Sequence, residues 1–89
     1  MNNVTLYTKD YCPFCKAAKS LLKGKGISFI NTEISNSPEL KDEMIKRSTG
    51  GHTVPQIFIG EKHIGDATDL MRLEEEGNLD TLLKLKNIA

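Results

Sequence analysis

Residues 4–24, VTLYTKDYCPFCKAAKSLLKG, predict a strand that passes through a short loop into a helix. Residues 4–8 are β-branched and aromatic, which favours a short strand. Pro13 suits the first position of a helix, where a missing N–H costs nothing, so Cys12 is expected at the N-cap. Apolar residues then recur at helical spacing until Gly24, which is typical of a helix end.

The middle of the chain predicts a second strand, a second helix and a hairpin. Residues 27–33 alternate enough between apolar and polar to be a strand. Ser37 and Pro38 suit the N-cap and first residue of a helix. Residues 56–59 are an apolar strand, and a two-residue Gly-Glu turn leads to a short antiparallel strand at 62–64.

Two more helices are expected towards the C-terminus. Thr68 is expected to cap the first of them, which ends at Gly77, and four leucines mark a last short helix: Leu79, Leu82, Leu83 and Leu85. The element order predicts an α/β fold in which a four-stranded mixed sheet carries helices on both faces. The first two strands, joined through a helix, are expected to be parallel with a right-handed crossover.

Length and charge limit the possible classes of protein. The 89 residues predict one domain over 1–89. Twelve basic and twelve acidic residues give a formal net charge of zero, which argues against a domain held to nucleic acid by bulk charge. We see neither a secretory signal nor an apolar run long enough to span a membrane. The chain is therefore expected to be a cytoplasmic protein, with a monomer as the default.

The chain has two cysteines, Cys12 and Cys15, in a C-x-x-C pair that follows a strand and opens a helix. At the N-cap, the Cys12 sulfur faces free N–H groups and the positive end of the helix dipole, which favour the thiolate. Cysteines in such sites titrate between about 3.5 and 7.5, against about 8.5 for a free thiol. Lys9 and Lys16 act in the same direction, and residues 1–25 hold five lysines against one aspartate.

The division of labour in the pair follows from its spacing. Cys15 shares a helix face with Cys12 and should be more sheltered, so we expect Cys12 to attack and Cys15 to resolve a mixed disulfide. Half of a zinc site and two inert core cysteines are the alternatives. Zinc takes four ligands, and the only other soft candidates are His52 and His63. Proline inside the motif and the strand before it favour redox chemistry.

Three motifs together resemble the glutaredoxin family over nearly the whole chain. They are the segment TKDYCPFC at 8–15, TVP at 53–55, and IGxxxDL at 64–70. The resemblance implies a thioredoxin fold with sheet order 2-1-3-4. It also implies glutathione-dependent reduction of protein disulfides and of protein–glutathione mixed disulfides. The motif C-P-F-C is close to the C-P-Y-C of dithiol members and unlike the C-G-F-S of members that carry iron–sulfur clusters.

The resemblance also implies roles for individual residues. Cys12 matches the nucleophile of the family and Cys15 its resolving thiol. The positions that match a glutathione site are Lys9, Phe14, Thr53, Val54, Pro55, Gly65, Thr68 and Asp69. In that site Lys9 faces the glycine carboxylate, Val54 offers its backbone N–H and C=O to the cysteinyl part, and Pro55 is the cis-proline facing the disulfide. Phe14 keeps an aromatic wall without a hydroxyl, while Thr68 and Asp69 hold the γ-glutamyl end.

One position departs from the family pattern. Asp66 stands where a second glycine is usual, and a glycine position can require a positive φ that aspartate tolerates only partly. Asp66 also adds negative charge near the γ-glutamyl carboxylate, so we expect weaker glutathione binding than in a Gly-Gly relative. Arg47 is a further candidate for a glutathione carboxylate, with a solvated helix face as its alternative. His52 and His63 are expected at the surface.

The resemblance implies glutathione as co-substrate, with no tightly bound cofactor and no metal. The expected partners are disulfide-bonded or glutathionylated proteins, and ribonucleotide reductase is one protein substrate that the resemblance suggests. Two alternatives stay open: a glutaredoxin-like electron donor recharged by thioredoxin reductase, and a scaffold in which two chains hold an iron–sulfur cluster through Cys12 and glutathione.

Overall fold

The computed structural model describes residues 4–10 and 12–83. In chain order its elements are β1 (Val4–Thr8), α1 (Pro13–Gly24), β2 (Phe29–Glu33), α2 (Pro38–Arg47), β3 (Gln56–Ile59), β4 (Lys62–Gly65), α3 (Ala67–Glu75) and α4 (Asn78–Leu82). This order confirms the one predicted from the sequence. Leu85 lies outside the described residues. None of the helices within those residues is long and apolar enough to cross a lipid bilayer.

The four strands form one mixed sheet in the order β2-β1-β3-β4. β1 runs parallel to β2, with Val4 opposite Phe29, and antiparallel to β3. β3 and β4 form the closing antiparallel hairpin, whose register shifts once between Ile57 and Phe58. The parallel pair is connected through α1, and the sheet order is the one that the family resemblance implied.

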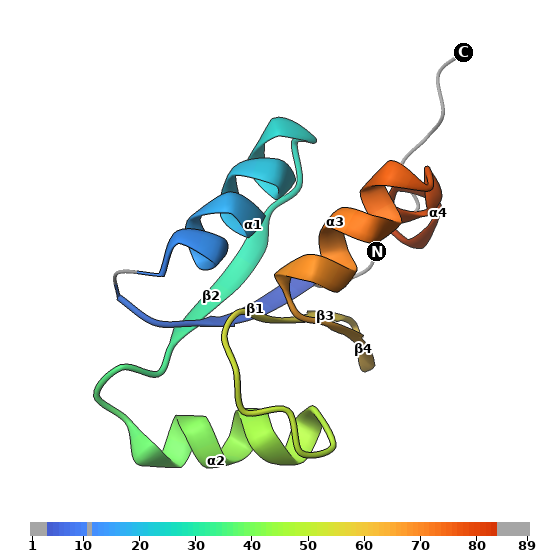
Figure 1. Ribbon diagram of the computed structural model, residues 1–89. Coiled ribbons are helices and arrows are strands. Elements are labelled where there is room, and N and C mark those ends of the chain that lie inside the picture. The colour runs from blue at the N-terminus through green and yellow to red at the C-terminus, as the bar shows by residue number, and fades with distance from the viewer. Residues whose placement is uncertain (1–3, 11, 84–89) are drawn as a thin grey trace.

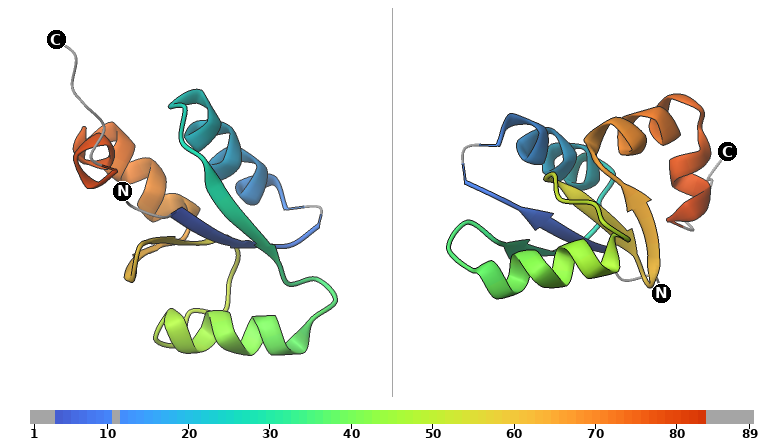
Figure 2. Two further views of the ribbon diagram at one scale, coloured as in Figure 1. Left: turned by 180° about the vertical axis from the view of Figure 1, so that it is seen from behind. Right: turned by 60° about the horizontal axis from the view of Figure 1, so that its bottom comes forward.

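Helices cover both faces of the sheet. α1 and α3 lie on one face, with α4 beyond α3, and α2 lies alone on the other (Figure 1). The views from behind and from below show the same layers (Figure 2). Because successive residues of a strand point to opposite faces, the central strands β1 and β3 supply residues to both cores.

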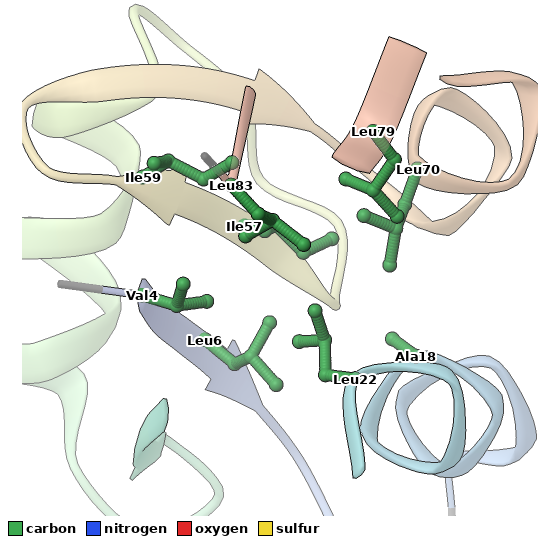
Figure 3. Packing of buried hydrophobic residues seen from close by; sticks show 9 residues of the cluster. All are labelled: Val4, Leu6, Ala18, Leu22, Ile57, Ile59, Leu70, Leu79 and Leu83. Atoms are coloured by element: carbon green, nitrogen blue, oxygen red, sulfur yellow. The ribbon is translucent and has the colours of Figure 1, made fainter. Parts of the chain in front are cut away.

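The larger core lies between the sheet and the helices α1, α3 and α4. It holds the buried residues Val4, Leu6, Ala18, Leu22, Ile57, Ile59, Leu70, Leu79 and Leu83 (Figure 3). Leu22, Leu70 and Leu79 have no exposed side-chain surface, and a fully buried leucine contributes about 1.5–3 kcal/mol to folding. This core therefore holds α1 and α3, whose first turns form the site described below.

The smaller core lies under α2. It consists of Tyr7, Ile34, Met44 and Phe58, which are all buried. The rings of Tyr7 and Phe58 meet edge to face, with centroids 5.6 Å apart. Their neighbours in the strands, Leu6 and Ile57, belong to the opposite core, as the two-residue period requires.

Two predicted boundaries are wrong. The second strand begins at Phe29 rather than at residue 27. The third helix begins at Ala67, and its N-cap is Asp66 rather than Thr68. The Asp66 carboxylate accepts a hydrogen bond from the Asp69 N–H at 3.1 Å, which ends the extended chain two residues earlier than expected. Thr68 instead lies inside the first turn of α3.

Candidate active site

Cys12 and Cys15 lie at the start of α1 and are joined as a disulfide, with Cα atoms 5.1 Å apart. Cys12 is the N-cap, in extended conformation, and Pro13 follows it as the first helical residue. The Cys12 Sγ accepts the Cys15 N–H at 3.1 Å. Cys12 is half-buried, whereas Cys15 is 2% exposed. The N-cap position of Cys12 and the more sheltered position of Cys15 are both confirmed.

The surroundings of the pair are positive. The first turn of α1 holds no acidic residue. Both cysteines line a hollow of about 550 Å³ together with Lys9, Lys16 and Lys19, and the rest of its lining is Asp10 and Pro13. Three ammonium groups and the positive end of α1 face this hollow, so it favours a negative charge on sulfur.

Residues 53–55 form a short segment that we call the strap, and this segment lies next to Cys12. It connects the loop after α2 to β3, and the peptide bond between Val54 and Pro55 is cis. The carbonyl oxygen of Val54 lies 3.9 Å from the Cys12 Sγ. The TVP segment and the cysteine pair, which are far apart in the sequence, are therefore neighbours in the fold.

A second hollow, of about 280 Å³, runs from the strap to the start of α3. Its lining consists of Phe14, Thr53, Val54, Pro55, Asp66, Ala67 and Thr68. Five of these seven residues are among the glutathione positions named from the sequence. Phe14 is 67% exposed and forms an open aromatic wall. The structure thus brings three distant segments of the chain to one hollow.

Three of the named positions lie elsewhere. Lys9 lines the hollow of the cysteine pair rather than that of the strap. Gly65 and Asp69 lie behind the start of α3, where the Asp69 Oδ2 accepts the Asp66 N–H at 3.2 Å. Gly65 has a φ of +126°, and a Cβ there would overlap the Asp69 carboxylate. Gly65 therefore allows the close approach on which the cap of α3 depends.

The expectation of backbone strain at Asp66 is wrong. Asp66 has a φ of −94° and a ψ of −169°, an extended conformation open to any residue. Of these two residues only Gly65 has a positive φ, and Asp66 serves as the N-cap of α3. The expectation of weaker glutathione binding now depends only on the charge of Asp66.

Arg47 and His63 also differ from expectation, because both contact the core under α2. Arg47 donates to the Tyr7 hydroxyl at 2.7 Å, and its guanidinium carbon lies 4.3 Å from the Phe58 ring centroid. It therefore does not line the hollow of the strap. Burial, and next the hydrogen bond to Glu43, raise the pKa of Tyr7, which Arg47 partly offsets. His63 is half-buried against Phe58 rather than a surface residue, whereas His52 is exposed as expected.

Sequence and structure comparisons assign the family. The model of the glutaredoxin family matches residues 4–64. Glutaredoxin 3 of Escherichia coli strain K12 is 52% identical over 84 residues, which cover 94% of this chain and 100% of that protein. The chain belongs to the glutaredoxin family.

Solved glutaredoxins share its fold. The solution structure of a glutaredoxin from Brucella melitensis has a TM-score of 0.82 at 47% identity, covering 100% of this chain and 96% of that one. The crystal structure of a buckwheat glutaredoxin–glutathione complex has a TM-score of 0.83 at 29% identity, covering 93% of this chain and 77% of that one. This glutaredoxin is a glutathione-dependent thiol–disulfide oxidoreductase with the thioredoxin fold.

Sequence reasoning missed Ala67, which lines the hollow of the strap, and the role of Asp66 as the cap of α3. The spacing of Asp66 and Asp69 is a capping-box pattern that could have revealed the cap. Gln56, directly after Pro55, bonds to the strap, and no local pattern indicates this. Within residues 4–10 and 12–83, no three His, Cys, Asp or Glu side chains gather as a metal-binding group.

Proposed function

We propose that Cys12 is the nucleophile of this glutaredoxin and that Cys15 resolves its mixed disulfides with protein substrates. One observation carries the proposal: the sulfur that caps α1 lies 3.9 Å from the carbonyl oxygen of Val54 in the strap. A thiolate at Cys12 would be stabilised by the helix N-terminus and by the lysines of the adjoining hollow. A disulfide substrate lying along the strap would present its sulfur to that thiolate.

Glutathionylated proteins would react through Cys12 alone. The Cys12 thiolate attacks the glutathione sulfur, the S–S bond to the target breaks, and the target leaves as a thiolate that takes a proton from water. Cys12 then carries glutathione as a mixed disulfide. A second glutathione thiolate attacks the bound glutathione sulfur, which releases oxidised glutathione and returns the Cys12 thiolate.

Protein disulfides would need both cysteines. Cys12 attacks one sulfur of the target and forms a mixed disulfide, and the Cys15 thiolate then attacks the Cys12 sulfur. The target leaves as a dithiol and the Cys12–Cys15 disulfide remains, which is the bond present in this structure. Two glutathione molecules then reduce that disulfide and leave as oxidised glutathione.

The hollow of about 280 Å³ beside the strap is proposed to hold the glutathione moiety. The Val54 backbone would pair with its cysteinyl part as an added strand does, against Pro55 and the exposed ring of Phe14. Thr53 adds polar surface on the same side. Thr68, in the first turn of α3, would hold the γ-glutamyl end, and Lys9 would attract the glycine carboxylate from the adjoining hollow.

The supporting residues of α3 have a less direct part. Gly65 and Asp69 form the turn and cap that place Thr68, so their proposed contribution to glutathione binding is to shape this end of the hollow. Glutathione is proposed as co-substrate, without a tightly bound cofactor. Glutathionylated or disulfide-bonded proteins, ribonucleotide reductase among them, are the proposed partners of a cytoplasmic monomer.

Turnover of a glutathionylated peptide tests the proposal. The assay couples glutathione, glutathione reductase and NADPH, and compares the native protein with Cys12→Ser and Cys15→Ser. We expect native and Cys15→Ser protein to turn over and Cys12→Ser to fall to the uncatalysed rate, because only Cys12 is needed for the glutathione step. A protein disulfide substrate should then separate native protein from Cys15→Ser.

Two results would contradict the proposal. An active Cys12→Ser protein would move the nucleophile to another residue. An inactive native protein would contradict the proposed glutathione site. Reduction by thioredoxin reductase and binding of an iron–sulfur cluster would then be measured next.

A further inference from the structure

Gln56 is a buried polar residue beneath the strap. It is the first residue of β3 and is 3% exposed. Its side-chain Nε2 donates to the Thr53 carbonyl oxygen at 2.9 Å and lies 3.2 Å from the Thr53 Oγ1. Its Oε1 lies 2.6 Å from the Nε2 of His63. All three contacts use the amide of one side chain, so Gln56 links the strap to β4.

The hydrogen-bond chemistry fixes both ends of this link. A carbonyl oxygen can only accept, so the atom of Gln56 that faces the Thr53 carbonyl must be its NH₂ group. The amide oxygen then faces His63, whose Nε2 must carry a hydrogen. The neutral ring with its hydrogen on Nε2 and the charged ring both meet this requirement, whereas the neutral ring with its hydrogen on Nδ1 does not.

His63 is itself held in place by the core under α2. It is opposite Phe58 in the hairpin, and the two ring centroids are 4.9 Å apart with an angle of 32° between the planes. The other ring contacts of Phe58 are with Tyr7 and the Arg47 guanidinium. A packed aromatic cluster therefore sets the direction of the hydrogen that His63 donates.

The loop before the strap packs on the same amide. A Cβ at Gly51 would lie 3.2 Å from the Gln56 Nε2 and 2.9 Å from the Ser48 Cβ. Only glycine fits this approach without a shift of its neighbours. Gln56 is thus enclosed by the loop on one side and by His63 on another, and its amide has little freedom to turn.

We propose that Gln56 is a positioning residue for the glutathione site, and that His63 orients Gln56. By binding the carbonyl and hydroxyl oxygens of Thr53, Gln56 fixes the plane of the peptide that leads into Val54. The Val54 backbone groups that would pair with glutathione are then set before the substrate arrives. This inference rests on the proposed function and adds two residues of the sheet, one in β3 and one in β4, that touch neither glutathione nor sulfur.

The expected signature is a rise in KM without a matching fall in kcat. Gln56→Met removes the amide at nearly the same volume, so the strap loses its anchor while the core stays filled. KM for the glutathionylated peptide should rise about tenfold, as expected for losing one to two net hydrogen bonds to a binding element. The kcat should stay within about twofold, because the Cys12 sulfur is held by the Cys15 N–H of α1, a bond that this substitution leaves in place.

His63→Phe and the double variant test the link itself. Phenylalanine keeps a ring against Phe58 but donates no hydrogen bond. Gln56 can then still bond to Thr53, but its amide oxygen loses the partner that holds the amide in one orientation. KM should rise about threefold. In the Gln56→Met background the same substitution should change KM by less than about 1.5-fold, because His63 acts only through Gln56.

Tyr7→Phe is the matched control. It removes a buried hydroxyl from the same face of the sheet, which donates to Glu43 at 2.5 Å and accepts from Arg47 at 2.7 Å. The variant keeps the ring that packs on Phe58, and the hydroxyl that it removes bonds to Glu43 and Arg47 rather than to the strap. It should therefore unfold at a lower urea concentration and keep the native KM. An unchanged KM in Gln56→Met, or an equal rise in Tyr7→Phe, would overturn the inference.

A spectroscopic measurement separates failure of this inference from failure of the proposed function. The ¹⁵N spectrum of the histidine rings at pH 8 should show His63 with its hydrogen on Nε2, and Gln56→Met should shift the amide signals of Thr53 and Val54. A hydrogen on Nδ1, or unmoved strap signals, would overturn the positioning role whatever the activity. An inactive native protein with the expected spectra would instead contradict the proposed function alone.

Discussion

The two helices that meet at the site, α1 and α3, begin in different ways. At α1 the cap is the Cys12 sulfur, which accepts one N–H, and the first turn has no acidic residue. At α3 the cap is the Asp66 carboxylate, which accepts the Asp69 N–H, and the Asp69 carboxylate in turn accepts the Asp66 N–H, which completes a capping box. Two negative charges therefore meet the positive end of α3.

The difference shows that an N-cap can either stabilise a helix end or support reactivity there. The capping box of α3 satisfies its free N–H groups and offsets its dipole, so that end of the helix is a stable wall of the hollow. The first turn of α1 holds no acidic residue and lies next to Lys16 and Lys19. Its cap is the Cys12 sulfur, which can lose its disulfide bond to Cys15. Because the cap is the reactive sulfur itself, the positive end of the helix dipole can stabilise the Cys12 thiolate.

Breaking the cap of α3 should have the largest effect on stability. Gly65→Ala places a Cβ against the Asp69 carboxylate at a φ of +126°, so both the backbone and the capping box must give way. We expect a loss of about 3 kcal/mol in the free energy of unfolding, measured by urea denaturation of the oxidised protein. Gly60→Ala is the control, because Gly60 has a φ of +63° with open space around it, and should lose about 1 kcal/mol. Equal losses would show that the Asp69 contact is unimportant.

Making the start of α1 resemble that of α3 should lower the reactivity of Cys12. Lys16→Glu puts a carboxylate near the first turn, in the hollow that both cysteines line. Alkylation of the reduced protein by iodoacetamide at pH 6 should slow about fivefold, because less of Cys12 is thiolate. Lys19→Glu, about one turn further along the helix, should slow it only about twofold. If both variants react at the native rate, the local charge does not control the sulfur.

The far ends of the helices are joined, which offers a smaller test. Lys25, the C-cap of α1, contacts Glu74 of α3 at 2.7 Å and Asp80 of α4 at 2.6 Å. Both carboxylates are substantially exposed, so Lys25→Met should lose only about 0.5–1 kcal/mol at pH 7. Circular dichroism during urea unfolding measures this, and Lys23→Met, an exposed change in the last turn of α1, is the control.

The same pairing predicts a pH dependence. Hydrogen bonds to Asp80 and then to Glu74 raise the pKa of Lys25 above its ordinary 10.5. The stabilisation is therefore complete below pH 10.5 and is lost as the pH rises through the higher folded pKa. The pKa of Tyr7 is also raised, so ionisation of Tyr7 likewise lowers the stability of the protein as the pH rises above 10.0. The alkaline fall in stability should therefore be shallower in Lys25→Met and should still be present; an unchanged slope would exclude Lys25 as a contributor.

Removing one charge from the cap of α3 should have the smallest effect. Asp66→Asn keeps a good N-cap side chain, so stability should hardly change. If glutathione binds beside Asp66, losing the negative charge should lower KM for the glutathionylated peptide by about twofold. Asp80→Asn, on α4 and outside the hollow, controls for total charge. A KM that does not fall would show that the charge of Asp66 does not weaken glutathione binding, just as its unstrained backbone does not.

Most of the fold could be predicted because its signals are local. Pro13 and Pro38 mark helix starts whatever lies around them, and the Gly-Glu turn at 60–61 joins two strands that pair with each other. The family resemblance supplied the sheet order, which local patterns did not specify. The extent of one domain over residues 1–89 stays a prediction.

The errors came from residues whose partners could not be identified in advance. Thr68 and Asp66 are both good caps, and the choice between them followed from the reciprocal bond with Asp69. Arg47 has the chemistry to bind a carboxylate, yet α2 lies on the face of the sheet where Tyr7 and Phe58 take up its guanidinium. Charge alone did not indicate which surface it would meet.

By itself, the sequence determined the cysteine pair at a helix start, its order of exposure and its positive surroundings. Those properties depend on neighbours within one turn of helix, so they are present in any fold that keeps the strand, the loop and Pro13. Only the tertiary structure decided that the Val54 carbonyl faces Cys12, that Thr68 lines the hollow beside the strap, and that Gln56 bonds to both Thr53 and His63. These contacts depend on the packing of α1, α2 and α3 against one sheet, which brings together segments that are far apart in the chain.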